Sequence, residues 1–154
     1  MRTLLFSVLL AFGLFAQAQS LWFEAGVGYI EQEATVYAAA PKVGLRGALP
    51  LGAAQDASPE LFAALAWREG LIADAGVWFP LAPGITDPFG LRSYLGAGLS
   101  YVRGDFGLAL SAAASYELSR NLALSFSYTH RPLVFPRLAQ AFDASIGLRW
   151  SLEP

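Results

Sequence analysis

Nine charged residues recur at alternate positions of short apolar segments, which places them on one face of an extended chain. Five are basic and four acidic: Glu24, Lys42, Arg46, Glu60, Arg68, Asp74, Arg92, Asp143 and Arg149. Because an unpaired charge removed from water is costly, nearly balanced charges favour pairing within an enclosed space. The pairs that we predict are Glu24 with Arg149, Asp74 with Arg92, and Arg46 with Glu60. The alternative is that these charges line a small pore or a polar ligand site.

The second chemistry to consider is nucleophilic catalysis, for which the chain offers one histidine, His130. A hydroxyl nucleophile must lie within hydrogen-bond reach of its base. In an extended segment Ser127 and Thr129 point to the face opposite His130. We therefore predict no catalytic residue.

Cofactor and metal chemistry find no support in the residue types present. The chain has no cysteine, which excludes disulfides, thiolate metal sites and a cysteine nucleophile. No spacing of His, Asp and Glu suggests a metal site, and no phosphate-binding loop leads from a strand into a helix. We predict neither a metal nor a cofactor.

The composition is that of a membrane protein or an unusually apolar domain. Hydrophobic residues make up 55% of the 154 residues and charged residues 14%, whereas soluble domains carry about 25% charge. Disorder requires low hydrophobicity and high net charge. Nucleic-acid binding requires a basic surface, and the net charge is −2. Both classes are therefore excluded.

The first 18 residues have the layout of a secretory signal peptide. A basic start, Met1 to Thr3, precedes an apolar run over residues 4–15 and a small-x-small cleavage pattern, Ala16-Gln17-Ala18. The run is shorter than the roughly 20 residues of a membrane-spanning helix. We predict a cleavable leader over residues 1–18 and a single domain over 19–154.

We expect the secondary-structure elements that position the charged residues to be strands. Gly, Pro and charged residues interrupt every later apolar stretch before it could form a spanning helix, and polar and apolar residues alternate between the interruptions. The strands that we predict cover residues 21–30, 35–49, 60–68, 71–79, 89–102, 105–117, 121–130 and 140–152. A membrane protein without helices must close its sheet, because lipid cannot pair free backbone groups. The fold class is therefore an all-β, eight-stranded antiparallel up-and-down transmembrane barrel.

The side chains on the two faces of each strand differ in size. This difference indicates which face points outward and which points into the barrel. One face carries most aromatic residues and no charge, as expected of a lipid-facing surface with aromatic girdles. The other face is mostly Gly, Ala and Ser with the charged set and four aromatics, and it suits the narrow interior of eight strands. The inward aromatics that we predict are Trp22, Phe62, Trp78 and Tyr94.

The connections are expected to alternate between the two ends of the barrel. With both termini at the periplasmic end, the outer connections are 31–34, 69–70, 103–104 and 131–139. Only the last is long enough to protrude, either folded over the rim or presented to a partner. The turns at the end with the termini, 50–58 and 80–88, are longer than is usual for transmembrane barrels.

Two stretches, Tyr94 to Tyr101 and Tyr116 to Leu124, resemble the small OmpA/OmpX-type outer-membrane barrels. The final strand also resembles the assembly signal of that family, through Ser145, Gly147, Trp150 and Leu152. It departs from the family pattern in continuing through Glu153-Pro154.

The resemblance implies an integral outer-membrane protein, with outer-membrane lipids and the barrel-assembly machinery as partners. We expect a monomer with a mostly closed, charge-paired lumen, a structural role and no enzymatic activity. A narrow pore for small solutes is the first alternative. A lipid-modifying enzyme is the second, because some barrels of this kind catalyse such reactions.

Overall fold

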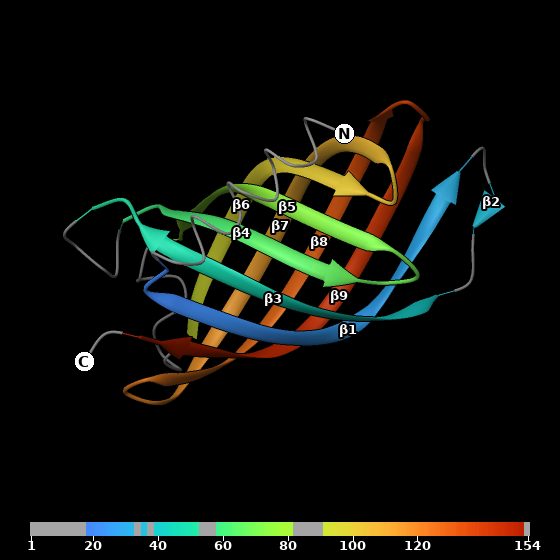
Figure 1. Ribbon diagram of the computed structural model, residues 1–154. Coiled ribbons are helices and arrows are strands. Elements are labelled where there is room, and N and C mark those ends of the chain that lie inside the picture. The colour runs from blue at the N-terminus through green and yellow to red at the C-terminus, as the bar shows by residue number, and fades with distance from the viewer. Residues whose placement is uncertain (1–17, 33–34, 37–38, 53–57, 82–90, 153–154) are drawn as a thin grey trace.

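A computed structural model describes residues 18–32, 35–36, 39–52, 58–81 and 91–152. The predicted leader therefore lies outside the described residues, except for Ala18. The strands are β1 (Ser20–Gln32), β2 (Thr35–Val36), β3 (Ala40–Pro50), β4 (Glu60–Trp67), β5 (Leu71–Pro80), β6 (Leu91–Val102), β7 (Asp105–Ser119), β8 (Leu122–Phe135) and β9 (Ala139–Ser151) (Figure 1).

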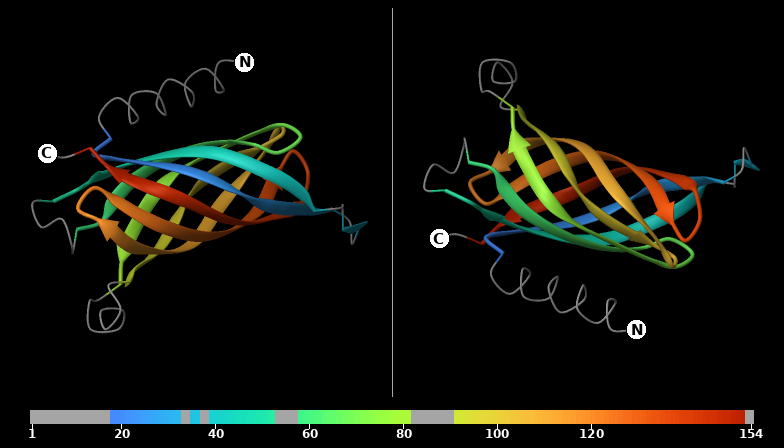
Figure 2. Two further views of the ribbon diagram at one scale, coloured as in Figure 1. Left: turned by 90° about the horizontal axis from the view of Figure 1, so that it is seen from below. Right: turned by 90° about the horizontal axis from the view of Figure 1, so that it is seen from above.

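Eight of these strands form a closed antiparallel barrel. Each strand from β3 to β9 pairs with its neighbour in the chain, and β1 pairs with both β3 and β9. The closing ladder runs from Ser20 opposite Ser151 to Glu31 opposite Gln140. Both views in Figure 2 show the barrel, with the short β2 extending from one end. The predicted fold class is confirmed as a closed eight-stranded barrel.

The two ends of the barrel differ in their connections. At one end Leu152 N–H donates to Gln19 O at 2.7 Å, so the described chain starts and finishes there. We call this the terminal end. The opposite end carries short turns, including the two-residue turn Arg103-Gly104, where both residues have positive φ, 53° and 106°. Such a turn matches the twist of a hairpin, and Gly adopts this φ without strain.

The structure corrects the prediction of a protruding loop over residues 131–139. Strand β8 continues to Phe135, with Arg131 opposite Ala141 and Leu133 opposite Ala139 on β9. Pro132 cannot donate a hydrogen bond, and it lies beside an irregular part of the β7–β8 ladder, where a strand tolerates proline. Only residues 136–138 connect β8 to β9.

Smaller differences concern strand limits and undescribed segments. The predicted strand 35–49 consists of the two-residue β2 and the separate β3. Much of the predicted long turns 50–58 and 80–88 lies outside the described residues, as do the aromatic residues Tyr37 and Phe89 of the predicted strands 35–49 and 89–102.

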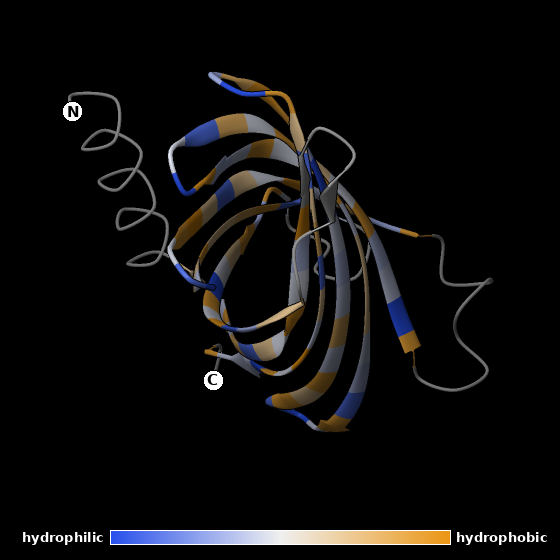
Figure 3. Cartoon of the chain, turned by 90° about the vertical axis from the view of Figure 1, so that its right-hand side faces the viewer, coloured by the Kyte–Doolittle hydropathy of each residue, from blue (hydrophilic) through white to orange (hydrophobic). Residues whose placement is uncertain are grey.

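The alternation predicted from the sequence separates the two surfaces of the sheet. Outward side chains are large and apolar, including Phe23 at 58% and Trp67 at 61% exposure. Hydrophilic and hydrophobic positions alternate along the strands in Figure 3. The predicted inward aromatics are all buried: Trp22, Phe62, Trp78 and Tyr94.

No helix among the described residues is long and apolar enough to cross a membrane.

Candidate functional site: the barrel lumen

The centre of the lumen is an arginine held between two aspartates. Arg131 on β8 donates from Nε and Nη2 to the Asp74 carboxylate on β5, at 3.0 Å to Oδ1 and 2.6 Å to Oδ2. Its Nη1 donates to Asp143 on β9. Ser100 donates a further hydrogen bond to Asp74 Oδ1 at 2.6 Å. Two-pronged guanidinium–carboxylate contact fixes both charges in direction as well as distance.

Asp143 also binds two further cations. Arg68 Nη1 lies 2.7 Å from its Oδ1, and Lys42 Nζ lies 3.6 Å from its Oδ2. A Cβ at Gly28 would overlap both the Asp143 carboxylate and the Arg68 guanidinium. The missing side chain at position 28 therefore provides the space in which this ion pair forms.

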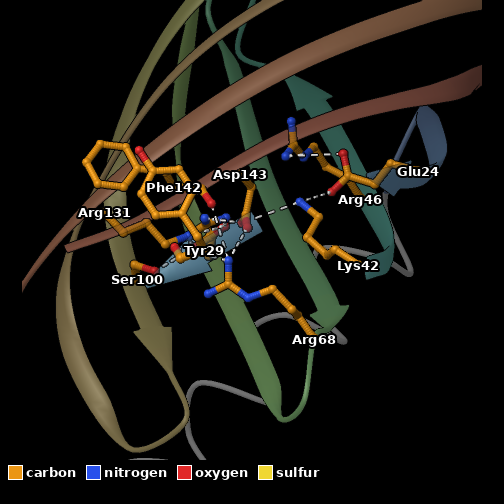
Figure 4. A network of polar contacts seen from close by, with 10 residues as sticks. Glu24, Tyr29, Lys42, Arg46, Arg68, Ser100, Arg131, Phe142 and Asp143 are labelled. Carbon is orange, nitrogen blue, oxygen red and sulfur yellow. Dashed lines mark hydrogen bonds and ion pairs between the residues drawn. The ribbon is translucent and has the colours of Figure 1, made fainter. Parts of the chain in front are cut away.

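Glu24 continues the network toward the terminal end. Lys42 Nζ lies 3.2 Å from Glu24 Oε1, and Arg46 Nη2 lies 3.5 Å from Oε2. We call these seven buried residues the central ion network: Glu24, Lys42, Arg46, Arg68, Asp74, Arg131 and Asp143. Figure 4 shows how strands far apart in the sequence supply its members.

An aromatic layer lies between the network and the terminal end of the barrel. Its members are Trp22, Phe62, Trp78 and Tyr94, with ring centroids of the contacting pairs 5.2–5.6 Å apart. The Trp78 indole donates to Ser111 Oγ at 2.8 Å, and a Cβ at Gly96 would overlap its ring. The Arg46 guanidinium lies over the Trp78 ring at 4.6 Å, which joins the network to the layer by a cation–π contact.

Beyond the aromatic layer, Arg149 marks the terminal mouth of the lumen. Its guanidinium donates to Glu60 Oε1 at 2.9 Å and to Tyr94 Oη at 2.8 Å, and it lies 4.3 Å from the Trp22 ring centroid. At the opposite end an apolar cap fills the lumen. The cap includes Ile72, Val102, Leu133 and Ala141, all buried.

Eight of the nine predicted lumen charges are enclosed or nearly so, and the ninth is not. Arg92 lies at the terminal mouth, where its half-exposed side chain contacts Glu117 at 2.6 Å. The prediction that Arg92 joins a buried network is therefore wrong. Its strand face is inward as predicted, but its position near the start of β6 leaves it at the rim.

All three predicted ion pairs are wrong, and in two of them distance along the strands separates the partners. Asp74 lies opposite Ser100 on β6, eight positions from Arg92. Arg46 lies opposite Ala64 on β4, four positions from Glu60. The two residues of the third predicted pair bind other partners: Glu24 binds Lys42 and Arg46, and Arg149 binds Glu60.

The residue that the sequence interpretation missed is Arg131. The sequence pattern places it in the predicted loop 131–139, because Arg131-Pro132 is typical of the end of a strand. The signal that could have revealed it is parity, since Arg131 and Leu133 share the inward face of Thr129, and all three are buried.

His130 lies outside the lumen, as its parity predicts. Its imidazole stacks on Phe142 with centroids 4.5 Å apart, and its Nε2 lies 3.2 Å from Gln140 Oε1. Thr129 is buried on the inward face. Among the described residues no group of three or more His, Cys, Asp or Glu is placed to hold a metal ion.

The four residues that resemble an assembly signal divide between the two faces of β9 and its end. Ser145 is buried and Gly147 lies opposite Glu24, whereas Trp150 and Leu152 are more than half exposed on the outside. Their role in assembly remains a prediction.

Comparison with known proteins gives no match to a family model or to a curated protein. Solved structures do match. Neisserial surface protein A aligns with TM-score 0.64 at 14% identity, covering 86% of this chain and 96% of that one. The N-terminal barrel domain of Pseudomonas aeruginosa OprF aligns with TM-score 0.58 at 18% identity, covering 86% and 97%.

The outer membrane enzyme PagL aligns with TM-score 0.51 at 11% identity, covering 84% of this chain and 98% of that one. Identities at this level establish shared architecture and leave the role open. The chain thus has the closed eight-stranded barrel fold of small outer-membrane proteins.

Proposed function

We propose that this chain is an integral outer-membrane barrel with a structural role, whose lumen is closed by paired charges. The observation that carries the proposal is the central ion network. Its carboxylates and cations reach across the lumen from β1, β3, β5, β8 and β9 and form ion pairs with one another. They therefore obstruct the lumen and do not line an open channel. The aromatic layer and the apolar cap close the lumen on either side of the network.

The outer surface supports placement in a membrane. Its exposed side chains are apolar along successive strands, including Val27, Leu99, Leu108 and Ile146. In water such a continuous surface would be an aggregation hazard, whereas in lipid it is solvated. The predicted leader and the predicted assembly signal support export to an outer membrane, with the terminal end in the periplasm. Lipids and the barrel-assembly machinery are the expected partners.

The decisive measurement is conductance. We expect the purified, folded chain in planar lipid bilayers to give no large, stable conductance. A matched variant, Arg131→Ala with Asp74→Ala, removes a buried pair from the network and should raise conductance if the pair obstructs the lumen. A large ion-selective conductance of the native chain would overturn the closed-lumen proposal.

A narrow pore is the second candidate, and one observation favours it. Arg46 Nε, Arg68 Nη2 and Ser145 Oγ are buried without a hydrogen-bond partner among the described residues. Buried polar groups of this kind are commonly satisfied by internal water. A continuous file of such waters would support small-solute passage, which the same bilayer recordings detect.

We also propose that the chain has no lipid-modifying activity. His130 contacts Gln140 and Phe142 on the outside, and the adjacent Thr129 hydroxyl lies inside the barrel. A nucleophile and its base must share one site. Mass spectrometry of lipid A from cells that express the native chain or His130→Ala should give the same acyl pattern. A difference between the two would support the enzyme alternative.

A further inference from the structure

The terminal mouth of the lumen holds a polar pocket of about 160 Å³. Its charged lining residues, among those that the structure describes, are Glu60, Arg92, Glu117, Arg120 and Arg149. Beneath them lies the aromatic layer, which Arg149 contacts through Trp22 and Tyr94. The pocket therefore ends on a closed floor within the barrel.

The negative part of the pocket has unused hydrogen-bonding capacity. Glu60 is 4% exposed, and its Oε1 accepts a hydrogen bond from Arg149. Its Oε2 has no hydrogen-bond partner among the residues that the structure describes. A buried carboxylate oxygen without a donor is costly, so a ligand that supplies a charged N–H group is favoured there.

The positive part of the pocket has an arginine that forms no ion pair among the described residues. Arg149 binds Glu60 and Arg92 binds Glu117. Arg120 lines the same pocket from the turn between β7 and β8, and it forms no ion pair within the described part of the chain. An isolated cation would leave Arg120 without an ion-pair partner among the described residues, and an isolated anion would leave Glu60 Oε2 unsatisfied.

We propose that this pocket binds a small zwitterion of the amino-carboxylate class, with its ammonium group at Glu60 and its carboxylate at Arg120. Such a molecule carries an ammonium group to partner Glu60 Oε2 and a carboxylate to partner Arg120. The inference does not depend on the membrane role, since the pocket opens at the terminal end whether or not the lumen conducts.

The test uses the full-length folded chain in detergent micelles. Trp22 reports binding, because its indole lies beneath the Arg149 guanidinium that lines the pocket. We expect L-alanine or γ-aminobutyrate to shift the Trp22 indole N–H resonance saturably. Propionate and ethylammonium, which carry one charge each, should bind at least about tenfold more weakly.

Two variants address the two halves of the site. Glu60→Gln and Arg120→Gln should each weaken binding of the zwitterion by about tenfold or more. Arg120 lies in an exposed turn, so its substitution tests the proposal even if Glu60→Gln impairs folding. The matched control is Arg103→Gln, in an exposed turn at the opposite end, which should bind as the native chain does.

Three outcomes would overturn the proposal. They are absence of a saturable shift with both zwitterions, equal affinity for propionate or ethylammonium, and unchanged affinity in Arg120→Gln. None of these outcomes bears on the conductance measurement, so the two proposals fail independently.

Discussion

Arg131 is the residue on which charge compensation of Asp74 depends most within the central ion network. It is 1% exposed and is the cation in direct contact with Asp74, while Asp143 also has Arg68 and Lys42. Without Arg131, Asp74 retains the Ser100 hydroxyl as its direct contact. A buried carboxylate with one neutral donor is poorly compensated.

Replacing Arg131 with methionine should therefore lower the free energy of unfolding by about 3–5 kcal/mol, the usual cost of breaking a buried pair. Urea unfolding in lipid vesicles, followed by tryptophan fluorescence, measures the change. The control is Arg103→Met, because Arg103 and Glu69 form a half-exposed pair at 3.6 Å, which contributes at most about 1 kcal/mol. Equal losses in the two variants would contradict this account of Arg131.

Gly28 offers a second test at this scale, since its Cβ position is occupied by the Arg68–Asp143 pair. Gly28→Ala should cost roughly 1–3 kcal/mol through overpacking. Among the described residues, the methyl added in Gly52→Ala meets the side chain of Ser58, whose hydroxyl can rotate away, so a smaller loss is expected. The same urea titration compares them, and an unaffected Gly28→Ala would show that the pair does not need this space.

At the scale of elements, β8 shows what the sequence could and could not predict. Alternation identified the barrel strands and the inward aromatic layer, because parity depends only on neighbours in the chain. Pro132 suggested a loop, yet the strand continues past it, since the irregular β7 ladder does not require its missing N–H. The ion pairs could not be predicted, because they depend on how far long side chains reach across a tilted, staggered barrel.

The extended β8 predicts a contrast between two adjacent residues. Leu133 is buried in the apolar cap and Val134 is exposed on the other face. Leu133→Ala should cost about 2–5 kcal/mol by leaving a cavity, whereas Val134→Ala should change stability by less than about 0.5 kcal/mol. If residues 131–139 formed a loop, both substitutions would be nearly neutral in the same unfolding assay.

For the whole molecule, the outward surface makes a prediction that distinguishes lipid from water. Leu99 is 69% exposed in the interior of β6, and Leu138 is 75% exposed in the connection after β8. If the barrel spans a membrane, Leu99→Arg should cost about 2–4 kcal/mol, while Leu138→Arg, beyond the strands, should cost about 0–1 kcal/mol. Vesicle unfolding titrations measure both. Two equally small effects would contradict a membrane-spanning barrel.

The β1–β9 ladder also sets an order of events during biogenesis. Ser20 cannot meet Ser151 until the chain has been made as far as β9, so β1 lacks its partner on one side until that strand is available. Bringing together ends so distant in sequence is entropically slow, and an unpaired strand edge recruits other chains. A folding helper that shields β1 until β9 arrives would therefore act on the step most exposed to misassembly.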